Sequence, residues 1–231
     1  MAAPCLKTVI GHFKRLATKA DNRKSKSVTL TFVAINALRW LATFLATWPG
    51  SGSIALPFSP RDSWQSLFRS DASSDWGYGV FVYPQCLGIT GRWSEQDHET
   101  ARRSDITDGK ALDSDSSTVI ELMAMEVGLI KFGPALRGLR VQIELDSQTA
   151  ILDLRSWSGG RPGILAVVNR IWSLLISFEI TARFEHVLRD FNAVADALSK
   201  NLLPQARNLF QEEFGADLQV EVVGQDRTSC Q

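Results

Sequence analysis

Four acidic residues stand where regular elements of the chain are expected to end or begin. Asp71 and Asp146 stand at the ends of segments in which apolar and polar residues alternate as in strands. Glu121 and Asp196 lie in segments of helical spacing. In an α/β sheet the strand ends and the facing helix residues converge on one edge, so these carboxylates are expected to meet there. Carboxylates at short range repel one another, and divalent cations, which prefer oxygen ligands, would offset that repulsion. Two such ions about 3.5–4 Å apart can activate a water and stabilise the leaving oxygen of a phosphodiester, so the set predicts a metal-dependent phosphodiester-cleaving centre.

Each acid taken alone has a simpler interpretation. Asp71, which precedes Ala-Ser, is also typical of a turn cap, and Glu121 near a helix start is also typical of a partner for the helix dipole. Only the set of four favours metal chemistry. Mg²⁺ and Mn²⁺ accept the same oxygen ligands, so the sequence leaves the choice between these two ions open.

The segments that must position these acids alternate in type along the chain. Apolar and polar residues in alternation predict strands, and apolar residues at helical spacing predict helices. Strands are expected over 65–70, 76–83, 86–93, 139–145 and 179–187, and helices over 117–132, 148–157, 164–178 and 192–201, with the polar stretch 94–116 as a loop. Three consecutive strands followed by helix-separated strands predict an α/β (α+β) fold, in which a mixed sheet carries helices on its faces.

Four strings around the acids carry a family resemblance. In chain order, within residues 65–203, they read SDASSDWGYGVFV, VIELMAMEVGL, VQIELDSQTAILDL and FEHVLRDFNAVADALSK. They resemble the four blocks of ribonuclease H domains in retroelement reverse transcriptases, and most of all those of retrotransposons and pararetrovirus-like elements. The resemblance implies a ribonuclease H-like mixed five-stranded sheet with helices on both faces, preceded by a helical connection segment.

The resemblance also implies a reaction and a role for each acid. Asp71 and Asp146 would bridge or flank two ions, Mg²⁺ or Mn²⁺. Glu121 would bind the ion on the leaving-group side, and Asp196 would complete the ion on the nucleophile side. The reaction would be endonucleolytic hydrolysis of the RNA strand of an RNA–DNA hybrid, leaving a 3′ hydroxyl and a 5′ phosphate. The implied partners are that hybrid and the polymerase part of a reverse transcriptase.

Candidate substrate contacts lie close to the acids or in a neighbouring turn. Selectivity for RNA requires contacts to successive 2′-hydroxyls. The candidates are Ser73, Ser147, Asn192 and Arg161. Asn192 is equally consistent with orienting Asp196 or with capping the last helix. Arg161, in the turn 158–163, is consistent with a phosphate contact or with a solvated surface residue.

One feature of cellular ribonucleases H is missing from the sequence. Those enzymes carry a His in a mobile glycine-rich loop before the last helix. Here His186 lies in the last predicted strand, and the connection over 188–191 reads Leu-Arg-Asp-Phe. The resemblance therefore implies the metal-binding carboxylates of the family in this chain, but not a step assisted by His.

The composition is that of a globular protein with unevenly spread charge. The 231 residues are 45% hydrophobic and 22% charged, and their formal net charge is zero, so no overall basic field attracts nucleic acid. Residues 1–27 hold seven Lys or Arg against one Asp and are expected to form a basic mobile arm. Residues 28–64, a helix and linker, resemble the connection region of reverse transcriptases, 65–203 form the ribonuclease H-like domain, and 204–231 are a C-terminal extension.

Two further observations bear on where the protein works. Cys5, Cys86 and Cys230 are far apart and odd in number, which disfavours a disulfide framework or a CxxC metal site and predicts an intracellular compartment, cytoplasmic or nuclear. Residues 28–48 are long enough to span a bilayer. Arg39 near their centre would cost about 2.5–3.5 kcal/mol on insertion scales, which favours a packed helix and no membrane partner.

A second class of function stays open. A catalytically silent nucleic-acid-binding module, or a polyprotein relic, would have the same fold. A domain separated from its polymerase lacks the surface that tethers the substrate, so its binding would be too weak for useful cleavage. No Tyr-x-Asp-Asp polymerase motif occurs in the chain. The intact set of four acids favours an active nuclease, and the Asn-x-x-Ala-Asp-x-Leu-Ser block at 192–199 disfavours an integrase or a 3′ exonuclease.

Overall fold

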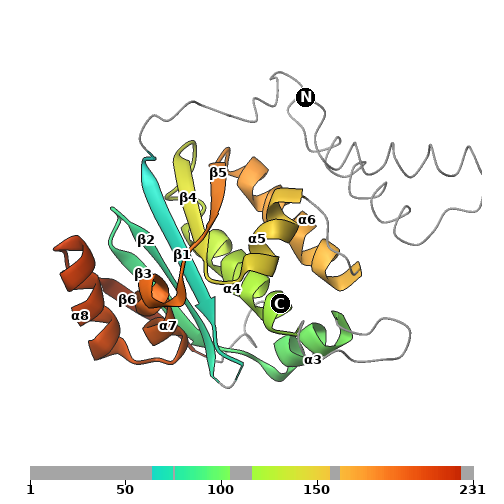
Figure 1. The fold of residues 1–231 in the computed structure, drawn as a ribbon, viewed down its shortest axis with the longest axis horizontal. Helices are drawn as coiled ribbons and strands as arrows, with labels where there is room; N and C mark the ends of the chain where they lie inside the picture. Colours follow the sequence, from blue (N-terminus) through green and yellow to red (C-terminus); the bar gives the residue numbers. More distant parts are fainter. Residues whose placement is uncertain (1–63, 75, 105–115, 157–161, 225–231) are drawn as a thin grey trace, which may run out of the picture. The chain divides into compact units, whose positions relative to one another are not determined.

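The computed structural model describes residues 64–74, 76–104, 116–156 and 162–224 (Figure 1). The expected basic arm, nearly all of the segment 28–64, and the candidate Arg161 lie outside these residues. None of the helices described is both long enough and apolar enough to cross a membrane.

A six-stranded mixed sheet, in the order β5-β4-β1-β2-β3-β6, forms the centre of this part of the chain. The strands are β1 (Ser66–Ala72), β2 (Gly77–Tyr83), β3 (Leu87–Arg92), β4 (Arg140–Leu145), β5 (Thr181–His186) and β6 (Gln219–Val223). β2 pairs antiparallel with β1 and β3, whereas β4 runs parallel to β1 and β5, and β6 runs parallel to β3. The predicted mixed sheet is confirmed, and the ends of its five predicted strands lie within two residues of those observed.

The predicted number of five strands is wrong by one. The sixth strand, β6, is a five-residue edge strand with no fully buried residue. A strand that buries so little shows no core-facing alternation strong enough to be distinguished from a polar tail.

The helices of the described residues are α3 (Glu95–Ser104), α4 (Ser116–Phe132), α5 (Gln148–Ser156), α6 (Pro162–Ser177), the 3-10 turn η1 (Arg189–Asn192), α7 (Ala193–Ser199) and α8 (Leu203–Phe214). Four of the α-helices were predicted, and α3 and α8 were not. The predicted loop 94–116 is therefore wrong over α3. This helix begins at a capping box: the Ser94 amide donates to Asp97 Oδ2 at 2.9 Å and the Asp97 amide donates to Ser94 Oγ at 3.1 Å. The segment was predicted to be a loop because it is strongly polar.

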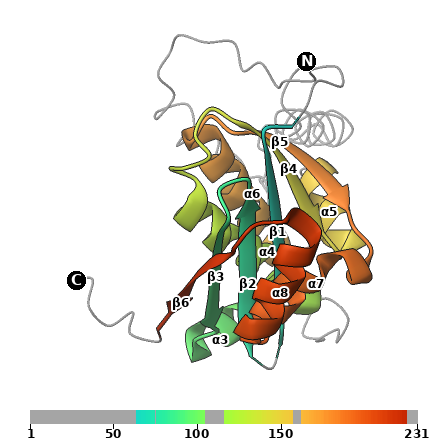
Figure 2. The ribbon, with the colours of Figure 1, turned by 90° about the vertical axis from the view of Figure 1, so that its left-hand side faces the viewer.

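The helices cover both faces of the sheet, with α4, α5 and α6 on one face and α7 and α8 on the other (Figures 1 and 2). α4 approaches the sheet closely because it carries Gly128. A Cβ atom there would lie 2.6 Å from Phe68 Cζ and 2.6 Å from Val80 Cγ1. The close packing of α4 fixes the height of Glu121, which is on the same helix, above the sheet.

α7 lies equally close on the opposite face, above β2. A Cβ atom at Gly79 would lie 2.3 Å from the Ser199 amide nitrogen and 2.5 Å from the Ala195 carbonyl oxygen, so the glycine is what admits the helix backbone. α8 packs outside α7 and closes a core whose buried members are Phe81, Val194, Ala195, Ala197, Leu198, Ala206, Phe210 and Leu218. The residues 204–231, expected to be an extension, thus supply a layer of the fold through α8 and a strand of the sheet through β6.

Candidate metal centre

Three of the four acids predicted from the sequence meet at one edge of the sheet. Asp71, Glu121 and Asp146 each offer a carboxylate oxygen, and these oxygens lie within 4.8 Å of one another. The parallel register of β1 and β4 pairs Arg69 with Glu144, so Asp71 and Asp146, each two residues further along, come side by side. Glu121 reaches them from α4.

The environment of this cluster disfavours three negative charges. Burial raises the pKa of Asp71 to about 6, a hydrogen bond from Ser199 opposes that rise, and the charge of Asp146 adds to it. Burial raises the pKa of Glu121 well above its ordinary value, and the charges of Asp71 and Asp146 raise it further. Burial also raises the pKa of Asp146, against the attraction of the Arg189 guanidinium. These carboxylates therefore hold protons, or another positive charge, more tightly than carboxylates in water.

The residues of the cluster fit a divalent metal ion. The Oε2 atom of Glu121 is buried and has no hydrogen-bond partner among the described residues, a costly arrangement unless a ligand supplies the missing contact. Mg²⁺ and Mn²⁺ take oxygen ligands of this kind. A bound cation would also offset the cost of burying these charges, which is the largest cause of the three raised pKa values.

Asp196, the fourth acid, lies beside this cluster without joining it. Both of its carboxylate oxygens accept hydrogen bonds from Lys200 Nζ at 2.7 Å, and Arg189 Nη2 lies 3.6 Å from Oδ1. Its charge still raises the pKa of Asp71, Glu121 and Asp146. The structure thus groups three of the four predicted acids and holds the fourth in an ion pair on α7.

α7 touches the cluster through Ser199, a residue to which the sequence analysis gave no role. The Ser199 hydroxyl is fully buried and donates to Asp71 Oδ2 at 2.6 Å. Ser199 and Lys200 follow Asp196 by three and four residues on one helix, so helical spacing was a usable signal for both. Arg189, in η1, carried no such signal, because its place depends on a turn between β5 and α7.

Two of the predicted substrate contacts, Ser73 and Ser147, lie in a turn and at the start of a helix, respectively. Ser73 lies in the turn after β1, where its amide donates to the Gly77 carbonyl at 2.7 Å and its carbonyl accepts from Trp93 Nε1 at 3.1 Å. Ser147 is partly buried at the start of α5, and its hydroxyl accepts from the Ala150 amide at 3.3 Å.

Asn192 requires a correction. Its side chain is fully buried and donates to the Ser70 carbonyl at 3.1 Å, which leaves no surface for a substrate backbone. It makes no side-chain cap on α7 either. Because it joins η1 to β1, it is a structural tether rather than a contact with the hybrid.

The raised pKa of Asp71 predicts how the metal-free protein responds to pH. The proton is bound more tightly in the folded state than in the unfolded chain, so this group stabilises the fold fully below its ordinary pKa of 3.8. That contribution, about 3 kcal/mol for a shift to about 6, is lost as the pH rises through 6. Urea unfolding in EDTA should therefore show a lower midpoint at neutral pH than at pH 5, and added Mg²⁺ should raise the neutral-pH midpoint. Asp71→Asn should lose this part of the pH dependence, and a wild-type midpoint insensitive to Mg²⁺ would contradict a metal site.

Comparisons with known proteins give one family match and several similar solved structures. Residues 97–202 match the model of a family described as reverse transcriptase-like. Among solved structures, the chain is similar to the N-terminal RNase H domain of Rv2228c from Mycobacterium tuberculosis, with 18% identity, a TM-score of 0.40 and coverage of 59% of this chain and 96% of that one. It is also similar to LC11-RNase H1, isolated from compost by a metagenomic approach, with 18% identity, a TM-score of 0.45 and coverage of 62% and 99%. The RNase H1 of the halophilic archaeon Halobacterium salinarum NRC-1 gives 18% identity, a TM-score of 0.39 and coverage of 60% and 96%.

No curated protein sequence matches the chain. The family match covers the segment from α3 to the end of α7, which includes Glu121, Asp146 and Asp196. Residues 97–202 therefore match the model of the reverse transcriptase-like family, and the predicted mixed α/β sheet is confirmed.

Proposed function

We propose that this domain hydrolyses the RNA strand of RNA–DNA hybrids endonucleolytically, with divalent metal ions, as the C-terminal part of a retroelement reverse transcriptase. The observation that carries the proposal is the cluster of Asp71, Glu121 and Asp146, of which the first two are buried and the third is half-buried. Their carboxylate oxygens lie within 4.8 Å of one another, and one oxygen of Glu121 has no partner among the described residues. The family match supports the reverse transcriptase context.

In this proposal the three clustered carboxylates hold the ions, Mg²⁺ or Mn²⁺, and Asp196 completes the set. When bound, the ions supply the positive charge that activates a water and stabilises the leaving oxygen. Ser199 fixes Asp71 Oδ2 by its hydrogen bond, which keeps that carboxylate in one orientation. Lys200 pairs with Asp196 beside the cluster.

The hybrid would lie across the edge of the sheet where the cluster is found. Ser73 and Ser147, which follow the acids of β1 and β4 in sequence, are proposed to contact it, and Arg161 is proposed to contact a phosphate. Recognition of RNA would come from contacts to its 2′-hydroxyls. The compartment, cytoplasmic or nuclear, stays a prediction.

A catalytically silent nucleic-acid-binding module is the second candidate, and one observation favours it. Asp196 is ion-paired with Lys200 and lies outside the three-carboxylate cluster. A site that kept only three carboxylates at the cluster would hold fewer ligands for a second ion than the proposed mechanism requires.

The proposal is tested by incubating the purified full chain with an RNA–DNA hybrid labelled on the RNA strand. Cleavage is expected with Mg²⁺ or Mn²⁺, with no products in EDTA and none from Asp146→Asn. The products should carry 5′ phosphates. A folded wild-type protein that binds the hybrid without cutting it under either ion would refute the nuclease and leave the binding module.

A further inference from the structure

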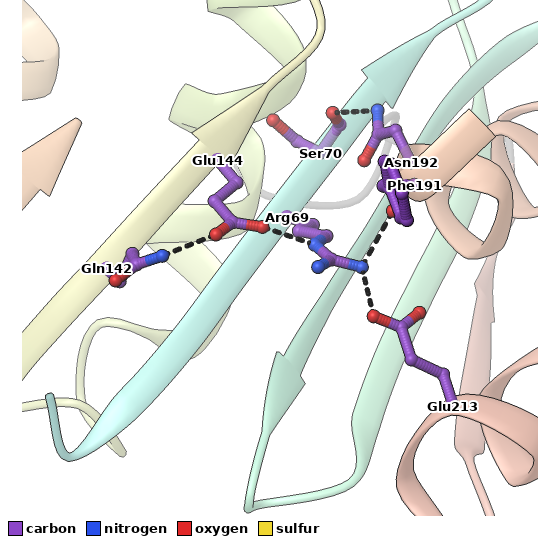
Figure 3. Close-up of polar contacts among 7 residues, drawn as sticks. All are labelled: Arg69, Ser70, Gln142, Glu144, Phe191, Asn192 and Glu213. Carbon is purple, nitrogen blue, oxygen red and sulfur yellow. Dashed lines mark hydrogen bonds and ion pairs between the residues drawn. The ribbon is translucent and has the colours of Figure 1, made fainter. Parts of the chain in front are cut away.

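The buried guanidinium of Arg69 joins four elements on the α7 side of the sheet (Figure 3). Its Nε atom donates to Glu144 Oε2 on β4 at 2.6 Å. Its Nη1 atom donates to the Phe191 carbonyl in η1 at 2.8 Å and to Glu213 Oε1 on α8 at 2.6 Å. Glu144 accepts a further hydrogen bond from Gln142. One side chain of β1 thus contacts β4, η1 and α8.

Stability alone is a weak explanation for this arrangement. The Arg69 side chain is 9% exposed and that of Glu144 12%, so both charges have lost most of their hydration. The attraction within a buried ion pair roughly offsets that loss, and an apolar pair of similar size often serves as well. A guanidinium, whose N–H donors form a rigid fork, can contact several acceptors in fixed directions at once, which an apolar pair cannot do.

Those contacts place η1 against the strand that carries Asp71. Arg69 precedes Asp71 by two residues in β1, so the two side chains lie on the same face of the sheet. Asn192, next to Phe191, donates to the Ser70 carbonyl at 3.1 Å. Two consecutive residues of η1 are therefore fixed to two consecutive residues of β1, immediately before Asp71.

η1 leads directly into α7, so its position sets the start of that helix. α7 carries Asp196 near its N-terminus and Ser199, which donates to Asp71 Oδ2, at its end. A displacement of η1 would move Asp196 relative to the three-carboxylate cluster. Arg69 touches none of the clustered acids, and its effect on them would pass through η1 and α7.

Glu213 connects the same guanidinium to the last turn of α8. The helix is anchored nearby, because the rings of Phe210 and Phe214 lie 5.4 and 5.8 Å from that of Phe81. The Arg69 guanidinium also lies 6.0 Å from the Phe214 ring. The side chain of Glu213 is 37% exposed. Because α8 is packed in place, Glu213 holds Arg69 Nη1 in the direction of the Phe191 carbonyl.

We propose that Arg69 and Glu213 are positioning residues, through which α8 fixes η1 and α7 and so sets the place of Asp196 beside the metal cluster. The catalytic part of this inference rests on the proposed nuclease function. It makes α8, outside the segment that matches the family, a functional part of the site.

The test compares Glu213→Gln with Glu221→Gln in the full chain. Glu221 is a matched control, since it also lies beyond α7 and forms a 2.6 Å ion pair, but with Lys131 on α4. Amide hydrogen exchange and the kcat and KM for hybrid cleavage are measured for both. Glu213→Gln should exchange about 10-fold faster over residues 189–199 only, and its kcat should fall about 10-fold at unchanged KM, the lower end for loss of an outer-shell partner. The control should change neither quantity. Arg69→Lys, which keeps the charge without the fork, should behave as Glu213→Gln does.

Three results would overturn the inference: unchanged exchange over 189–199, faster exchange throughout the sheet and α4, or locally faster exchange in an active enzyme at unchanged kcat. The second of these would reveal a general stabilising role and no positioning. If the wild-type protein cuts no hybrid, the proposed nuclease fails separately, and the exchange comparison alone decides whether Arg69 and Glu213 place η1 and α7.

Discussion

Glu121→Gln is expected to reduce metal-dependent cleavage by more than about 100-fold, because a metal ligand should matter more than an outer-shell partner, whose loss typically costs 10–100-fold. The same change should leave the metal-free protein as stable as the wild type or more so. Burial and the neighbouring charges raise the pKa of Glu121 well above its ordinary value, and a neutral amide of the same shape removes that repulsion. Loss of function with retained stability distinguishes a metal ligand from a core residue.

The measurements are the cleavage rate, and the unfolding midpoint in EDTA and in Mg²⁺. Glu126→Gln is the control, because Glu126 lies on the same helix but pairs with Arg170 at 2.6 Å, away from the cluster. The control should cleave normally and keep the stabilisation by Mg²⁺, whereas Glu121→Gln should lose both. A Glu121→Gln protein that still gains stability from Mg²⁺ would remove this residue from the proposed ligand set.

Gly79→Ala is expected to destabilise the fold and to abolish cleavage by displacing α7. The new Cβ would lie 2.3 Å from the Ser199 amide nitrogen and 2.5 Å from the Ala195 carbonyl oxygen, and backbone atoms of a packed helix cannot turn aside as a flexible side chain can. Overpacking of this kind costs about 1–3 kcal/mol or more. α7 must move away from β2 to relieve it, which would withdraw Ser199 from Asp71 and abolish cleavage.

Gly88→Ala provides the matched control in the neighbouring strand. A Cβ atom there would meet its nearest neighbours at 3.4–3.5 Å, an ordinary contact distance. Its unfolding free energy should equal that of the wild type or exceed it slightly, since alanine loses less backbone entropy in a strand than glycine does. Equal unfolding midpoints and cleavage rates for the two variants would show that α7 does not depend on close approach to β2.

Local pattern in the sequence was enough to predict most of the fold and the proximity of three of the four acids, whose metal-binding role stays a prediction. The existence of β1 to β5 and their order along the chain could be predicted from the sequence. Asp71 and Asp146 could be placed together because both were expected at strand ends on one edge of the sheet. β6 was missed because an exposed edge strand buries too little to be distinguished from a polar tail, and α3 because its strongly polar composition is typical of a loop.

Side-chain partners distant in sequence could not be predicted in the same way. The hydrogen-bond partners of Arg69 are separated from it by 75, 122 and 144 residues in sequence. No local pattern predicts such contacts. Asn192 was assigned a choice of surface roles and is fully buried, because the depth of η1 in the fold depends on those same contacts. The ion pair of Asp196 likewise depends on Lys200. The spacing of the two residues on the helix was visible in the sequence, but not that Asp196 pairs with Lys200 instead of joining the three-carboxylate cluster.

The parallel pairing of β6 with β3 has a consequence for the growing chain. β3 is the outer strand of the group β1–β3, and among the described residues its free edge pairs only with residues 219–223, synthesised more than 120 residues later. Until then the nascent protein exposes a row of unpaired backbone donors and acceptors, the feature that promotes strand pairing between molecules. Protection from aggregation therefore comes late in synthesis, and translation that stops after α7 would release chains with that edge uncovered.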